Sequence, residues 1–209
     1  MHSAVVPWLV GVVIGGAILA IGDGGHELYL LAGISGAVFG DLARRARRER
    51  LSGRNDSTDL GISLGFFGIV AASAFDLGRA GNEAWDAAEW WAHGLGALGI
   101  LAGVRLRAVS VRALGPNYAV RLGTSRDQAL VRHGPYRLIR HPNYAALLII
   151  ACGTALALAS PLALVATFTL WLPIAVLRIV REERMLVERF GERYREYRRG
   201  TWRLVPGLY

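Results

Sequence analysis

Residues 133–144 read His-Gly-Pro-Tyr-Arg-Leu-Ile-Arg-His-Pro-Asn-Tyr, a polar stretch directly before the apolar run 145–159. Gly134-Pro135 is a turn signal that places Pro135 in the first turn of a short helix. His141 precedes Pro142, which favours extended backbone at His141 and ends that helix. Pro142 then suits the first turn of a second, apolar helix. The N-terminus of that helix offers free N–H groups to an anion, and Arg140 beside it carries a forked, permanent positive charge. The stretch therefore predicts a functional site.

The composition indicates a membrane protein. Hydrophobic residues make up 53% of the 209 residues, and glycine, of which there are 26, is common in membrane helices. The net charge of +8 does not favour nucleic-acid binding, because the arginines cluster at the ends of apolar segments. The N-terminus lacks the basic region and cleavage site of a signal peptide, so we expect the first segment to remain as a helix.

Six apolar segments predict an all-α, polytopic membrane protein of one domain, 1–209, with five to six transmembrane helices. The last two segments are separated only by Ser160-Pro161 and predict a C-terminal helical hairpin. Five full crossings and a re-entrant turn are the alternative, because several segments are near or below ~17 residues. The segments are Val5–Ile21, Leu28–Leu42, Leu60–Leu77, Trp90–Val104, Tyr144–Ala159 and Leu162–Ile179.

The arginines also predict the orientation. The loop Arg44–Arg54 is strongly basic, as are the connection Arg105–Asn143 and the tail from Arg181. The positive-inside rule places them in the cytoplasm, whereas the acidic loops 22–27 and 79–89 belong outside. We therefore expect an integral protein of the cell (inner) membrane whose active site and C-terminus face the cytoplasm.

The tail 182–199 is predicted to be helical, with a possible break at Gly191. Its stripe of Leu186, Phe190, Tyr194 and Tyr197 is typical of an amphipathic helix at the membrane interface, and the terminal Trp202, Leu204 and Tyr209 are typical of an interfacial anchor. Arg178 and Glu182 share one face of the preceding helix; a functional role and snorkelling of Arg178 are both open.

Common catalytic patterns are missing from the sequence. No pair among the five histidines has i,i+4 ligand spacing, and the single Cys152 is distant from them, so no metal site is expected. Neither G-x-S-x-G nor a G-x-G-x-x-G after a strand is present, which disfavours a serine hydrolase and a Rossmann cofactor site.

The motifs resemble the isoprenylcysteine carboxyl methyltransferase family. The resemblance covers the region 114–207, whereas the N-terminal helices, 1–104, match nothing in particular. It rests on 134–136 (GPY), 140–144 (RHPNY), 182–186 (EERML), Phe190-Gly191, Tyr194 and Tyr197, with weaker elements at Leu114-Gly115 and Leu130-Val131.

The resemblance implies a methyltransferase that uses S-adenosyl-L-methionine in cytoplasmic cofactor-binding segments. It implies catalytic or substrate-side roles for Arg140 and Arg178. Two departures are Gln128, where relatives often have histidine, and Ala146, where they often have glycine. The implied cofactor contacts are Gln128, Ala129, Leu130, Val131, Tyr136, His141, Pro142, Asn143, Tyr144 and Glu182.

The expected reaction is methyl transfer to a hydrophobic, lipid-like small molecule that enters from the bilayer. A carboxylate acceptor needs no general base, whereas a phenol needs one, for which His141 and Glu183 are candidates. Carboxyl O-methylation of an isoprenylcysteine-type substrate is the first expectation. O- or N-methylation of a phenolic, isoprenoid or phospholipid substrate is the alternative. Two other classes stay open: an NADPH-dependent sterol-type reductase, and a transporter or scaffold that binds membrane lipid.

Overall fold

The computed structural model describes residues 57–80, 90–115 and 129–208, and these parts are helical apart from short connections. They contain no strand beyond one isolated bridge between Ile139 and Trp202. The first two predicted membrane segments, Val5–Ile21 and Leu28–Leu42, lie outside the described residues. The elements are α3 (Ser57–Ala80), α4 (Trp90–Leu114), η4 (Gly134–Arg137), α5 (Pro142–Ala157), α6 (Pro161–Ala166), the π-helical η5 (Thr167–Trp171), α7 (Leu172–Phe190) and α8 (Glu192–Arg199).

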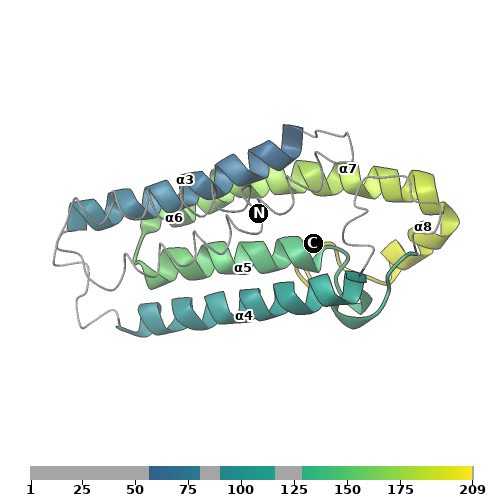
Figure 1. Ribbon diagram of the computed structural model, residues 1–209, viewed down its shortest axis with the longest axis horizontal. Helices are drawn as coiled ribbons and strands as arrows, with labels where there is room; N and C mark the ends of the chain where they lie inside the picture. Colours follow the sequence, from purple (N-terminus) through teal and green to yellow (C-terminus); the bar gives the residue numbers. More distant parts are fainter. Residues whose placement is uncertain (1–56, 81–89, 116–128, 209) are drawn as a thin grey trace, which may run out of the picture.

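The helices lie in two rows (Figure 1). In one row α3 runs along α6, η5 and α7, and in the other α4 and α5 lie side by side. The core between the rows contains aromatic and aliphatic side chains, among which Trp171 and Ile179 are almost completely buried. The helix α8 and the residues after it lie at one end, next to the start of α5. The predicted site and the tail are therefore brought to the same end of the bundle.

The predicted hairpin at Ser160-Pro161 is confirmed. The hydroxyl of Ser160 accepts a hydrogen bond from the backbone N–H of Ala163 at 3.1 Å and so caps α6. Asp76 of α3 reinforces the turn, because its Oδ2 accepts from Ser160 Oγ at 2.7 Å and from the N–H of Leu162 at 3.0 Å. The tip of the hairpin is thereby held to α3.

Two helices of the described part are long and apolar enough to cross a membrane, 91–114 and the continuous helix 161–190. The 16 residues of α5 span only about 24 Å, less than the ~30 Å hydrocarbon core. The number of crossings therefore stays a prediction. On α4 large apolar side chains point outward at helical spacing, as lipid-facing residues do: Trp91, Leu95, Leu98, Leu101 and Val104.

Glycines bring the backbones of α4 and α5 into direct contact. A Cβ atom on Gly96 would lie 2.3 Å from the backbone nitrogen of Ala157. A Cβ atom on Gly103 would lie 2.6 Å from Ile150 Cγ1 and 2.9 Å from the carbonyl oxygen of Ala146. Because no side chain fits between the two helices at these positions, the glycines of α4 determine where the N-terminus of α5 lies.

Candidate functional site

The stretch 133–144 folds as its prolines and glycine predict. The helix η4 begins at Gly134, whose φ of +59° lies in the left-handed region, and Pro135 occupies its first turn. His141 is non-helical, with φ −123° and ψ 58°, and α5 starts at Pro142. The predicted order of short helix, break and apolar helix is therefore confirmed, but η4 already ends at Arg137 and the backbone of His141 is not extended as predicted.

The chain after α8 pairs with this break. The N–H of Arg140 donates to the carbonyl of Trp202 at 2.8 Å, the N–H of Trp202 donates to the carbonyl of Leu138 at 3.0 Å, and the N–H of His141 donates to the carbonyl of Arg203 at 3.1 Å. Leu204 is buried in the core. The interpretation of Leu204 as an interfacial anchor was therefore wrong, because its side chain completes the core while the backbone beside it fastens the motif. Tyr209 lies outside the described residues.

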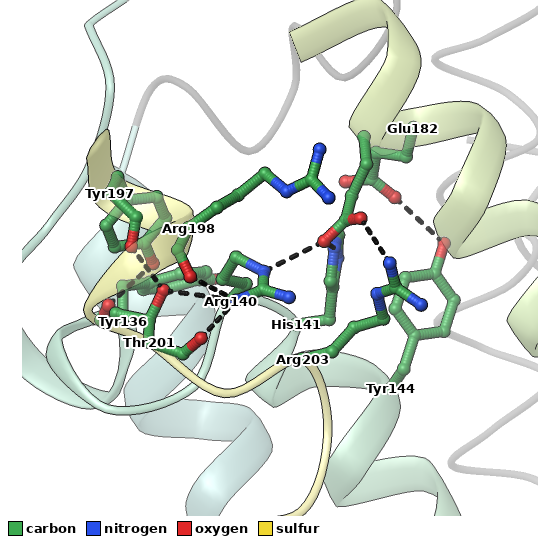
Figure 2. Close-up of polar contacts among 10 residues, drawn as sticks. Tyr136, Arg140, His141, Tyr144, Glu182, Tyr197, Arg198, Thr201 and Arg203 are labelled. Atoms are coloured by element: carbon green, nitrogen blue, oxygen red, sulfur yellow. Dashed lines mark hydrogen bonds and ion pairs between the residues drawn. The ribbon is translucent and has the colours of Figure 1, made fainter. Parts of the chain in front are cut away.

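The carboxylate of Glu183 on α7 is the hub of the polar network. It accepts from Arg140 Nε at 2.8 Å and from Arg203 Nη2 at 2.9 Å, and His141 Nε2 lies 3.5 Å away. Glu183 is only 4% exposed, so its two ion pairs have little screening by water. One carboxylate therefore joins α7 to the stretch 133–144 and to the chain after α8 (Figure 2).

Arg140 is held by protein groups on two sides. In addition to Glu183, it donates through Nη1 to the carbonyl oxygens of Arg198, at 3.1 Å, and Thr201. The sequence suggested Arg140 as a partner for a bound anion, but much of its hydrogen-bonding capacity serves the tail (Figure 2). This geometry favours a positioning role for Arg140.

A second polar chain joins α5 to α7. The phenol of Tyr144 accepts from Arg178 Nε at 2.8 Å and donates to Glu182 Oε2 at 3.2 Å. Arg178 is 3% exposed, which does not fit snorkelling to an aqueous interface. Arg178, Tyr144 and Glu182, which the resemblance implied separately, are therefore brought together.

A cleft of about 760 Å³, including the space open to solvent at its mouth, lies beside these residues. It collects most of the predicted cofactor contacts. Gln128 lies outside the described residues, Pro142 starts α5 without lining the cleft, and Ala146 is buried against α4. The lining residues are Leu114, Ala129, Leu130, Val131, Tyr136, Arg140, His141, Asn143, Tyr144, Glu182, Leu186, Phe190, Tyr194 and Tyr197.

The aromatic stripe of the tail helix belongs to this cleft. Gly191 has a φ of +55° and breaks the helix between α7 and α8, as its position in the sequence suggested. The break lets α8 fold towards η4, where the hydroxyl of Tyr197 donates to the carbonyl of Tyr136 at 2.6 Å. The interpretation of the stripe as a membrane-interface face was therefore wrong: Leu186, Phe190, Tyr194 and Tyr197 line the cleft.

Arg107 of α4 is a residue that the sequence analysis missed. Its Nη1 donates to Asn143 Oδ1 at 2.7 Å, across 36 positions of sequence. Because arginine is only a donor, this bond fixes which end of the amide faces Arg107, and Asn143 also lines the cleft. In the sequence Arg107 is one of several arginines at the end of an apolar segment, so no local signal distinguished it.

We expect Arg107→Gln to weaken binding at the cleft about 5- to 15-fold, because an Asn143 side chain that has lost its charged partner no longer keeps one orientation. The measurement, in detergent, is the Kd for S-adenosylhomocysteine, the product of the methyl donor that the sequence resemblance implies. The exposed Arg112 on the same helix supplies the control, Arg112→Gln, for which affinity should not change. Equal affinity in both variants would contradict the positioning role.

We expect Glu183→Gln to lower stability by about 3–5 kcal/mol, because two buried or half-buried guanidinium groups lose their shared counter-charge. Thermal unfolding in detergent measures this loss. Glu188 is exposed on the same helix, and Glu188→Gln should leave the Tm within about 1–2 °C. A Tm for Glu183→Gln equal to that of the control would show that the ion pairs do not hold the tail.

Known proteins match the chain in sequence and fold. The sequence profile of the isoprenylcysteine carboxyl methyltransferase (ICMT) family matches residues 95–188. Protein-S-isoprenylcysteine O-methyltransferase A of Arabidopsis thaliana is 32% identical over 119 residues, which cover 56% of this chain and 60% of the relative. The Dictyostelium discoideum protein-S-isoprenylcysteine O-methyltransferase is 28% identical over 57% of this chain and 50% of its own length. The chain thus matches little more than half of the length of these relatives.

The fold also has a solved counterpart. The structure of the eukaryotic intramembrane Ras methyltransferase ICMT superimposes with a TM-score of 0.57 and 21% identity, over 87% of this chain and 68% of that one. At this identity the likeness concerns the fold. Residues 95–188 of this chain thus match the isoprenylcysteine carboxyl methyltransferase family model, and the chain shares its fold with the solved ICMT structure.

Proposed function

We propose that the protein is an integral membrane methyltransferase that binds S-adenosyl-L-methionine in the cleft and methylates the carboxylate of an isoprenylcysteine-type substrate. One observation carries the proposal. A single cleft gathers Tyr136, Asn143, Tyr144 and Glu182 from three segments, next to the buried Arg178. The family match suggests the type of reaction, and the geometry of the cleft supports it as the site where the cofactor binds.

The side chains of the cleft suit such a cofactor. Glu182 offers a carboxylate to an ammonium or to ribose hydroxyls, and Asn143 offers an amide donor. Tyr136, Leu114 and Phe190 provide apolar and aromatic walls for a purine ring.

The protein's main contribution to the reaction would be orientation. The bound cofactor supplies an electrophilic methyl group on a sulfonium, and a carboxylate acceptor is already ionised at neutral pH. Holding the methyl group and the carboxylate in line therefore contributes more to the rate than proton transfer would. We assign this task to Arg178, whose charge attracts the carboxylate and whose Nε is anchored on Tyr144. Arg140 would act by fixing the motif and the tail, and neither His141 nor Glu183 would be needed as a base.

The surroundings support a substrate that is lipid-like. The outer face of α4 exposes large apolar side chains from Trp91 to Val104, while the cleft lies at the basic end of the bundle. A prenyl group would enter sideways from the bilayer, and the cofactor would arrive from water on the cytoplasmic side. The positive-inside rule supports this orientation.

Ligand-dependent thermal stability tests the cofactor. A ligand at 100 times its Kd stabilises the folded protein by about 2.7 kcal/mol, and the gain should appear with S-adenosylhomocysteine. Glu182→Gln should lose most of this gain, whereas the exposed Glu188→Gln should keep it. Stabilisation by NADPH alone would favour the reductase, and no stabilisation by either ligand would count against a nucleotide-like cofactor.

A further inference from the structure

Two tyrosines of α8 have the same surroundings but different partners. The rings of Tyr194 and Tyr197 lie 5.8 Å apart, both are buried, and both line the cleft. The Tyr197 hydroxyl donates to the carbonyl of Tyr136 at 2.6 Å. The Tyr194 hydroxyl is shielded from solvent and has no hydrogen-bond partner in the described part of the chain.

Packing alone does not explain a hydroxyl at position 194. Tyr194 is 1% exposed, and an unsatisfied buried polar group costs about 1–3 kcal/mol. Phenylalanine would fill the same space without this cost. The group also stays protonated, because burial and the nearby Glu183 charge raise the pKa of Tyr194 above its usual value. Tyr194 lines the cleft, and its protonated hydroxyl is therefore a hydrogen-bond donor without an acceptor.

We propose that the Tyr194 hydroxyl donates a hydrogen bond to an acceptor atom of the bound methyl donor, which makes Tyr194 a cofactor-affinity residue. The inference rests on the proposed function of the cleft. The two neighbouring tyrosines then have different roles. Tyr197 holds α8 on η4 through its hydrogen bond to Tyr136. Tyr194 forms its hydrogen bond only when the cofactor is bound.

The removal of one oxygen atom tests this role, because stability and affinity should change in opposite directions. In Tyr194→Phe we expect the Tm of the ligand-free protein to stay equal or rise, since an unsatisfied group is removed. The Kd for S-adenosylhomocysteine, measured by titration calorimetry on the full chain in detergent, should be about 5- to 15-fold weaker, as for one lost hydrogen bond.

Tyr197→Phe is the matched comparison for stability. It removes a hydroxyl that has a protein partner, so the Tm of the ligand-free protein should fall. An unchanged Kd in Tyr194→Phe would overturn the inference. So would a fall in the Tm of ligand-free Tyr194→Phe like that of Tyr197→Phe, because the hydroxyl would then have a structural partner. If the wild type itself did not bind S-adenosylhomocysteine, the proposed function would fail as well, and the two failures are thus distinguishable.

Discussion

Gly96→Ala is expected to destabilise the protein by about 3 kcal/mol, at the upper end of the cost of overpacking. The added Cβ would lie 2.3 Å from the backbone nitrogen of Ala157 and 2.6 Å from the carbonyl oxygen of Gly153. Backbone atoms cannot rotate away as the end of a side chain does, so α4 and α5 must separate. The expected fall in Tm is about 6–12 °C for a chain of this size.

The separation should also affect the cleft. Arg107 lies on α4 and Asn143 at the start of α5, so their hydrogen bond joins the same two helices that the added Cβ would push apart. We therefore expect Gly96→Ala to weaken binding of S-adenosylhomocysteine as well as stability.

Gly94 provides the control for this prediction. It belongs to the same helix, and a Cβ atom there would meet nothing within 4 Å. Gly94→Ala should leave the Tm unchanged or raise it slightly, since alanine favours a helix by about 1 kcal/mol over glycine. Equal stability of Gly94→Ala and Gly96→Ala would contradict the close packing of α4 on α5.

Arg178→Gln is expected to reduce methyl transfer by about 100-fold or more, because a misplaced reacting group costs on the order of 100-fold in rate. The residue is 3% exposed and its Nε is fixed on Tyr144, so the charge is both preorganised and poorly screened. Arg178→Lys should not restore activity, because an ammonium lacks the fork that can bind Tyr144 and a carboxylate together.

The kinetic signature distinguishes this role from a loss of fold. Turnover should fall by much more than affinity for S-adenosylhomocysteine, whereas a general loss of fold would reduce both to the same extent. Arg184, exposed on the same helix, supplies the control, and Arg184→Gln should retain normal turnover. Turnover of Arg178→Gln within threefold of the wild type would contradict the assignment of Arg178 to the substrate.

The breaks between helices were predictable because their causes are local. Pro142 starts α5, Ser160 caps α6, and Gly191 separates α7 from α8 by its positive φ. In each case a residue and its immediate neighbours decide the backbone conformation. The motifs were also visible in the sequence, although their grouping around one cleft required the fold.

The long-range contacts were not predictable from local rules. Arg107 meets Asn143 across 36 positions, and Arg140 meets Thr201 across 61. Such pairs depend on how the helices pack against one another, and the periodicity of a single segment carries no information about that packing. The stripe that includes Phe190 and Tyr194 was misassigned for a related reason: an amphipathic helix has the same sequence pattern whether its apolar face covers a cleft or meets lipid.

Transfer of a labelled methyl group from S-adenosylmethionine to a small S-prenylated, N-acylated cysteine in membranes that contain the protein tests the central claim most directly. A carboxyl methyl ester releases labelled methanol in alkali, whereas a methylated ether or amine does not. We predict a base-labile product that depends on Arg178 and Glu182 but not on Arg184. No transfer to this acceptor, or a base-stable product, would contradict carboxyl methylation as the function of the protein.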